Sequence, residues 1–256
     1  MASSSSINAS ALIRTVSELQ TFLSSITKSS KLYLDFHGIV IGLIAPQPLH
    51  LLTILISSGA NGDLTRVIDL DILGQLAFTT PSSNGQTLRD ILADATIQKC
   101  LWDVTKAVFA SKSVYRIHIA SVLDMQLLEN AKRHGGPGNT RLQRDVFWKS
   151  GNDGQQHLLP KKTLDEWRDT REVVESRKDP RKFIERPLDA RVLQYCVNQV
   201  VHYPMLYDLW KKGENMERLA DESERRLREG LERLERLWSE SNKPAPRDLT
   251  GPWREL

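Results

Sequence analysis

Apolar residues recur at helical spacing near the start of the chain and then give way to continuous apolar runs. Between residues 15 and 26 the apolar positions follow the spacing i, i+3, i+6 and i+7, which marks one face of a helix. Three apolar runs follow at 31–38, 49–57 and 65–70, and the turn-forming segment 59–63 separates the last two. Because short connections join antiparallel neighbours, these runs predict a three-stranded meander.

The pattern then changes to helices that alternate with strands. It predicts a helix at 88–95, a strand at 97–104, a strand that ends at Asp124 and a helix at 125–133. The segment 106–110 is expected to be too short for a full helix. Since such alternation is typical of parallel strands, the sequence predicts an α/β fold with a mixed sheet flanked by helices.

The last third of the chain is predicted to be helical and highly charged. One helix is expected to open at Pro187, and a long helix is predicted from about Tyr203 to Glu240. Its second part, 213–240, suits a coiled-coil arm that binds a protein partner or a second copy of the chain, and we favour this interpretation. The alternative is a helix that folds back on the domain. A narrow apolar stripe runs along this part and consists of Met216, Leu219, Leu227, Leu231, Leu234 and Leu237.

Composition excludes some classes of protein and leaves others open. Of the 256 residues, 40% are apolar and 26% are charged, which excludes wholesale disorder. The formal net charge of +3 is compatible with a nucleic-acid partner without indicating one. The two cysteines, Cys100 and Cys196, lie far apart in the sequence and argue against a disulfide framework. No run of about 18 apolar residues occurs, so we expect no membrane partner and an intracellular location in cytoplasm or nucleus.

Several blocks of the sequence, taken in order, carry a resemblance to a known family. They are LYLDFHGIVIG at 32–42, LHLLTILIS at 49–57, AFTT at 77–80, TLRDILADATIQKCLWDV at 87–104, VLDMQLLENAKR at 122–133 and ERPLDARVLQYCVNQVVHYPMLYDLW at 185–210. Together they resemble the 3′–5′ exonuclease domain of the DEDD superfamily, in its ribonuclease D branch and in the form common among fungal proteins. The resemblance implies a ribonuclease H-like sheet.

The resemblance also suggests how the chain is divided. The exonuclease-like domain is expected to cover residues 12–212, followed by the charged helix at 213–240. The Ser-rich start, 1–11, and the end, 241–256, are expected to be tails.

The family hydrolyses phosphodiesters with two divalent metal ions held by four carboxylates, and the resemblance places this chain's residues on those positions. Asp35 matches the first Asp, and His37 stands where the family has Glu. Ala107 falls where the second motif has its Asp. Tyr195 matches the Tyr of the last motif, and Gln199 replaces the Asp that follows it. One carboxylate of the four remains, so the catalytic motifs are degenerate.

This substitution pattern predicts a catalytically impaired domain that binds nucleic acid or protein. A single carboxylate leaves most of the charge of two Mg²⁺ ions unmatched, so no cofactor is expected. The alternative is an active 3′–5′ exonuclease on single-stranded nucleic acid, with Asp35 and His37 as ligands of Mg²⁺ or Mn²⁺ and with His202 or Asp124 nearby. Asp103 is a further candidate for the missing carboxylate. A second alternative is a scaffold that acts through the helix at 213–240.

Candidate contacts to nucleic acid come from one tyrosine and a basic series. Tyr195 is a candidate for stacking on a base. Lys161, Lys162, Arg181 and Lys182 belong to a series that could follow a phosphate backbone. Acidic residues interleave with this series, so an ordinary solvated surface is the alternative interpretation.

Overall fold

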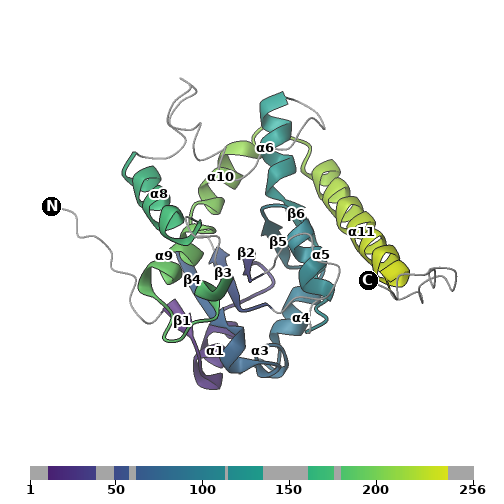
Figure 1. Cartoon of the computed structure of the whole chain (residues 1–256). Coiled ribbons are helices and arrows are strands. Elements are labelled where there is room, and N and C mark those ends of the chain that lie inside the picture. Colours follow the sequence, from purple (N-terminus) through teal and green to yellow (C-terminus); the bar gives the residue numbers. More distant parts are fainter. Residues whose placement is uncertain are drawn as a thin grey trace, which may run out of the picture.

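A six-stranded mixed sheet organises the fold, with the strand order β1-β4-β3-β2-β5-β6 (Figure 1). The strands are β1 (Leu12–Ile13), β2 (Lys31–His37), β3 (Leu51–Ser57), β4 (Asp63–Asp69), β5 (Gln98–Leu101) and β6 (Val122–Asp124). The antiparallel pairs β2–β3 and β3–β4 form the predicted meander, while β5 runs parallel to β2 and β6 parallel to β5. The sequence-based prediction of a mixed sheet is therefore confirmed. The two-residue strand β1, which pairs in parallel with β4, was not predicted.

The computed structural model describes residues 11–38, 49–57, 62–112, 115–134, 161–175 and 180–241. Its helices are α1 (Val16–Leu23), α2 (Leu70–Leu73), α3 (Leu76–Thr79), α4 (Leu88–Ala93), α5 (Thr105–Lys112), α6 (Met125–His134), α8 (Lys161–Glu175), the 3₁₀ helix η3 (Pro180–Phe183), α9 (Ala190–Asn198), α10 (Tyr203–Trp210) and α11 (Met216–Ser241). The predicted tails at 1–11 and 241–256 lie outside these ranges, apart from residues 11 and 241. Among the residues described, no helix is long and apolar enough to cross a membrane.

Successive residues of β2 point to opposite faces of the sheet, and this alternation separates the apolar core from the candidate site. Leu32, Leu34 and Phe36 face the main core cluster, which α1, α3, α4, α5 and α11 cover. Tyr33 and Asp35 face the other side. There α6, α8, α9 and α10 supply two smaller apolar clusters.

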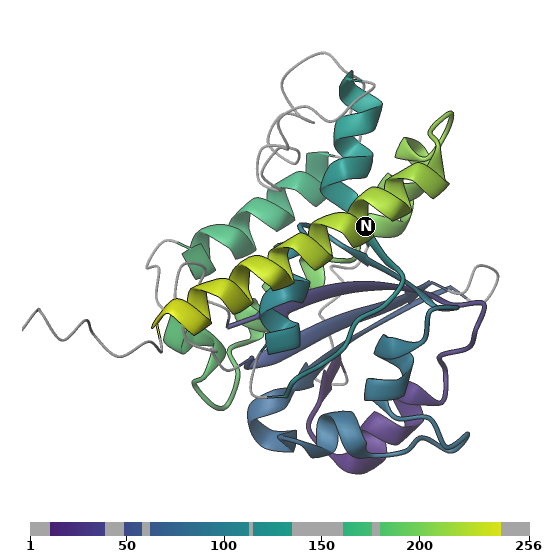
Figure 2. The ribbon, with the colours of Figure 1, turned by 90° about the vertical axis from the view of Figure 1, so that its right-hand side faces the viewer.

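The predicted long helix over 203–240 is wrong, because the chain forms two helices at this place. α10 ends at Trp210 and α11 begins at Met216, and between them Gly213 adopts a left-handed conformation with φ of +80°. A positive φ is readily available to glycine and breaks the helical path. The break lets α11 turn across the outside of β6 and α5 (Figure 2).

The apolar stripe of α11 is used inside the fold. Leu227 and Leu234 are 6% and 5% exposed and belong to the main core cluster. Leu231 packs against the same cluster, and a Cβ on Gly230 would lie 2.7 Å from Val108 Cγ2, so α11 and α5 are in close contact. Of the two arrangements that the sequence left open, the structure shows the helix folded back on the domain.

A second correction concerns the segment 106–110. It lies in a complete eight-residue helix, α5, rather than in a fragment too short to form one. Ala107, Val108 and Ala110 are buried in the main core cluster. Tertiary packing against β2 and α11 therefore stabilises a helix that local periodicity did not indicate.

Candidate functional site

The candidate site lies at the C-terminal end of β2. Asp35 and His37 lie two residues apart and so share a face, and Thr53 pairs with Asp35 across β3. All three are buried, with exposures of 3%, 5% and 0%. His37 Nε2 lies 2.9 Å from Thr53 Oγ1 and 3.6 Å from Asp35 Oδ2. The imidazole of His37 thus lies against a neutral hydroxyl and one carboxylate.

Helix α9 supplies the next layer of the site. Asp189 caps the helix by accepting a hydrogen bond from Arg191 N, and Tyr195 and Gln199 share a face because they are four residues apart. Tyr195 meets His37 edge-on, with ring centroids 6.2 Å apart and an interplanar angle of 62°. Gln199 is the C-cap residue of α9 and is 4% exposed. The structure therefore brings Tyr195 to His37 and buries Gln199 at the end of the same helix.

Two aromatic residues of the site were not predicted. Phe183 stacks on His37, with centroids 5.5 Å apart and planes 24° apart, and also contacts Tyr195. Tyr203 is fully buried, and its pKa is raised well above the ordinary value, first by burial and then by the negative charge of Asp35. Tyr203 is the first residue of α10 and lies between His202 and Pro204, whereas nothing in the sequence links Phe183 to His37.

The other carboxylates that the sequence offered do not join this group. Asp124 is in register with Leu101 and, through it, with Leu34, so it faces away from Asp35. Its carboxylate accepts hydrogen bonds from the backbone N–H of Asp103 and of Gln126 and forms an ion pair with Arg226 of α11. The suggestion that Asp124 lies beside His37 is therefore wrong. Burial raises the pKa of Asp124 to about 6, although Arg226 opposes this shift.

Ala107 also lies away from His37, on the other side of the sheet. It is fully buried in the main apolar cluster, together with Leu34. A carboxylate at this position would be surrounded by hydrocarbon. Of the remaining predicted neighbours, His202 is half-buried at the start of α10, and burial lowers its pKa to about 4, so it is neutral at physiological pH.

The residues present do not fit a two-metal centre. A magnesium pair needs a cluster of oxygen ligands, whereas among the residues described Asp35 is the carboxylate found beside His37, whose imidazole faces Thr53. No group of three or more His, Cys, Asp or Glu residues that could hold a metal ion occurs in the described part of the chain.

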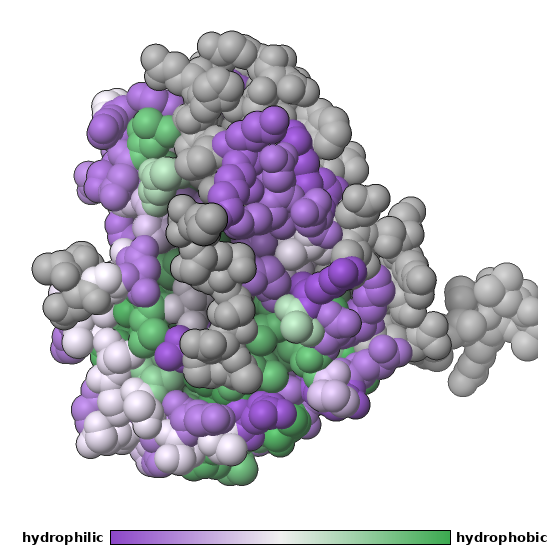
Figure 3. Space-filling view, turned by 90° about the vertical axis from the view of Figure 1, so that its left-hand side faces the viewer, coloured by the Kyte–Doolittle hydropathy of each residue, from purple (hydrophilic) through white to green (hydrophobic). Residues whose placement is uncertain are grey.

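The predicted basic residues lie on α8 and on the segment before α9. Lys161 and Lys162 are exposed in the first turn of α8, and Lys162 is 3.7 Å from Glu166. Lys182 is half-buried in η3, and the side chain of Arg181 lies outside what the structure describes. On the face that carries α8 and α9, hydrophilic residues dominate the upper part and hydrophobic residues gather below (Figure 3).

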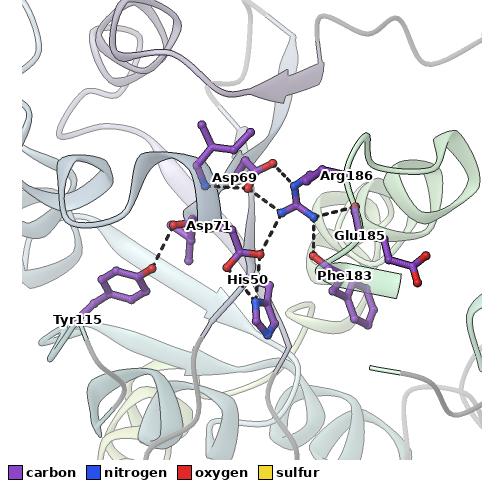
Figure 4. Close-up of polar contacts among 9 residues, drawn as sticks. His50, Asp69, Asp71, Tyr115, Phe183, Glu185 and Arg186 are labelled. Carbon is purple, nitrogen blue, oxygen red and sulfur yellow. Dashed lines mark hydrogen bonds and ion pairs between the residues drawn. The ribbon is translucent and has the colours of Figure 1, made fainter. Parts of the chain in front are cut away.

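A second polar network lies at the ends of β4 and η3, and Figure 4 shows its side chains converging. Arg186 donates two hydrogen bonds of 2.7 Å to the fully buried Asp69 and one of 3.2 Å to Asp71. It also donates to the backbone carbonyls of Phe183 and Glu185, at 2.8 and 3.1 Å. This network fixes the segment that carries Phe183.

The fold defines the class of domain: an α/β domain with a ribonuclease H-like mixed sheet. No protein-family model matches the sequence. No curated protein matches it either.

Solved structures with this fold include three ribonucleases. Trypanosoma brucei RNase D in complex with GMP shares 16% identity, with a TM-score of 0.67, over 86% of this chain and 63% of its own. Escherichia coli RNase D shares 19% identity, with a TM-score of 0.54, over 86% of this chain and 50% of its own. The catalytic core of RRP6 from Trypanosoma brucei shares 14% identity, with a TM-score of 0.56, over 86% of this chain and 51% of its own. The chain thus spans between half and two thirds of the length of these relatives.

Proposed function

We propose that this chain is a catalytically impaired exonuclease-like domain that binds single-stranded nucleic acid without hydrolysing it. The observation that carries the proposal is the replacement of the acidic centre. Asp35 stands beside His37, the imidazole faces Thr53, and Ala107 lies in the apolar core instead of carrying a carboxylate. Such a site lacks the charge to hold two Mg²⁺ ions.

Support for nucleic acid as the ligand comes from the fold and from two exposed cations on α8, the helix that packs along α9. A related structure with 14% identity and a TM-score of 0.65 is Trypanosoma brucei RNase D in complex with RNA U12. In this chain α8, with Lys161 and Lys162 exposed, packs along α9, which carries Tyr195. Lysines bind the phosphate backbone of a nucleic acid with an affinity that falls as the salt concentration rises, and an aromatic ring can stack on a base.

Binding and hydrolysis are tested in one experiment. Single-stranded RNA and DNA oligonucleotides with a 5′ fluorophore are titrated with the full chain in Mg²⁺ or Mn²⁺, by anisotropy for binding and by gel for cleavage. We expect saturable binding of intact oligonucleotide. The double variant Lys161→Ala/Lys162→Ala should reduce the salt slope of log K by about 0.7 per lysine that contacts a phosphate.

The matched control removes two exposed lysines on other elements, Lys28→Ala/Lys132→Ala, and should leave the salt slope unchanged. Stepwise shortening of the oligonucleotide from its 3′ end, lost in Asp35→Ala, would overturn the proposal. Equal binding by the two double variants would exclude α8 as the contact surface.

An active exonuclease with an altered ligand set is the second candidate, and the approach of His37 Nε2 to 3.6 Å from Asp35 Oδ2 favours it. Imidazole suits Mn²⁺ better than Mg²⁺. This candidate requires cleavage that depends on Mn²⁺ and is lost in both Asp35→Ala and His37→Ala.

A further inference from the structure

The segment 182–188, which we call the strap, comprises the end of η3 and most of the connection to α9, and it lies against the candidate site. Its Phe183 ring stacks on His37 at 5.5 Å, and both rings contact Tyr195. His37 is only 5% exposed, and Asp35 behind it is 3% exposed. The ring from the strap therefore covers one face of the imidazole and contributes to its burial.

Strong polar contacts hold the strap in place. Arg186 makes a two-pronged ion pair with Asp69, which is fully buried, and a further contact with Asp71. The same guanidinium donates to the carbonyls of Phe183 and Glu185, so it fixes the backbone that presents the Phe183 ring (Figure 4). Charge-assisted, bidentate contacts of this kind are about twice as strong as neutral hydrogen bonds.

The network also reaches the residue that follows His37. His50 Nδ1 lies 2.9 Å from Asp71 Oδ1, and the His50 ring packs against Gly38. Gly38 has a φ of +100°, and a Cβ at this position would lie 2.3 Å from His50 Cδ2. The strap is thus tied, through Arg186, Asp71 and His50, to the end of β2 on which the site is built.

We propose that the strap is an autoinhibitory contact that competes with single-stranded nucleic acid for the face of His37. This inference rests on the proposed function for the identity of the ligand, whereas the covering of His37 is a property of the fold itself. Only the fraction of molecules with the strap lifted is competent to bind, so the measured affinity is reduced by that fraction. A change that lifts the strap must raise the accessibility of His37 and the affinity for the oligonucleotide by the same factor.

The test uses the full chain with Phe183→Ala, which removes the covering ring and keeps the Arg186 anchor. Ile184→Ala is the matched control, because Ile184 is the next residue and is 45% exposed. Arg186→Lys is a second variant that keeps a positive charge beside Asp69 but loses the two-pronged geometry. Diethylpyrocarbonate labelling is followed at His37 by peptide mass spectrometry, with the exposed His118 as internal reference. Affinity is measured by anisotropy with the same 5′-labelled oligonucleotide.

We expect Phe183→Ala to increase both the labelling rate of His37 and the oligonucleotide affinity by about tenfold, in equal proportion. Arg186→Lys should shift both in the same direction, and Ile184→Ala should match the wild type. The inference is overturned if His37 is labelled at the same rate in Phe183→Ala as in Ile184→Ala. It is also overturned if Phe183→Ala shows faster labelling of His37 but binds the oligonucleotide more weakly. Faster labelling without oligonucleotide binding in any variant, wild type included, supports the strap as a cover and refutes nucleic acid as the ligand.

Discussion

Arg226 links α11 to the buried end of β6, and its removal tests whether α11 is an integral part of the domain. The substitution Arg226→Met keeps most of the alkyl side chain and removes the guanidinium that pairs with Asp124. Asp124 is fully buried, so the variant leaves its carboxylate away from water with backbone donors alone, from Asp103 at 3.2 Å and Gln126 at 2.9 Å.

The magnitude follows from this arrangement. Breaking a buried ion pair by removing one partner costs about 3–5 kcal/mol. The Arg226 side chain is 25% exposed and Asp124 retains its backbone donors, so we expect the lower end of this range, about 3 kcal/mol at pH 8.

The loss should also depend on pH. Burial raises the pKa of Asp124 from 3.8 to about 6, so the folded state binds more protons than the unfolded state in this window, and the contribution of Asp124 to stability falls as pH rises through it. Without Arg226 the pKa of Asp124 in the folded state rises further. The destabilisation should therefore be largest at pH 8 and smaller at pH 5, where the carboxyl group is protonated.

Urea unfolding of the wild type, Arg226→Met and Arg225→Met at pH 5 and pH 8 measures both effects. Arg225 is the neighbouring residue and pairs with Glu222 and Glu229 of its own helix. Arg225→Met should therefore match the wild type at both values of pH. Equal losses in the two variants, or a loss in Arg226→Met that does not change with pH, would refute the reasoning.

Three further predictions concern the core. Gly230→Ala should destabilise the wild type by about 1 kcal/mol, because its Cβ would lie 2.7 Å from Val108 Cγ2. In a Val108→Ala background, where this clash is absent, the same change should stabilise the protein by about 1 kcal/mol. A double-mutant cycle measured by urea unfolding checks both values. Ala107→Asp should destabilise the fold by at least about 3 kcal/mol in thermal or urea unfolding, since it buries an unpaired carboxylate among apolar side chains; unchanged stability would show that residue 107 faces a polar site. Burial lowers the pKa of Lys99 to about 8, and its Nζ donates to Asp94 O. Between pH 8 and pH 10.5 the unfolded state therefore binds more protons at Lys99 than the folded state, so the stability of the wild type relative to Lys99→Met should rise with pH. A difference in unfolding free energy that stays constant over this range would contradict the prediction.

The sequence was sufficient to predict the sheet apart from β1, but not the paths of its helices. The apolar runs at 31–38 and 49–57 correspond to β2 and β3, because a strand buried on both faces shows an apolar pattern that local sequence reveals. The helix α5 depends on packing against β2 and α11, which local periodicity does not encode, and the break at Gly213 depends on the left-handed φ of one glycine. The same packing turns the apolar stripe of α11 inward, whereas the sequence alone favoured a partner for it.

The site shows a similar division. Asp35, His37 and Tyr195 could be placed together because a strand repeat of two and the family order fix their positions, and the structure brings His37 and Tyr195 into contact. Thr53 and Phe183 could not be placed, since each reaches His37 from a distant part of the chain. The position of Asp124 was wrong because one residue of strand register decides which face a side chain occupies.

The low negative charge of the site is also what makes binding without a metal physically reasonable. Four carboxylates without cations would repel the phosphates of a nucleic acid, and burial would strengthen this repulsion. Within the described ranges a single carboxylate, Asp35, is buried with His37 and Thr53, and the aromatic rings of Phe183 and Tyr195 border the group. Changing His37 to Glu would place a second carboxylate within reach of Asp35 and remove the contact with Thr53. We therefore expect His37→Glu to weaken oligonucleotide binding in EDTA, measured by anisotropy, whereas tighter binding in EDTA would contradict this electrostatic argument.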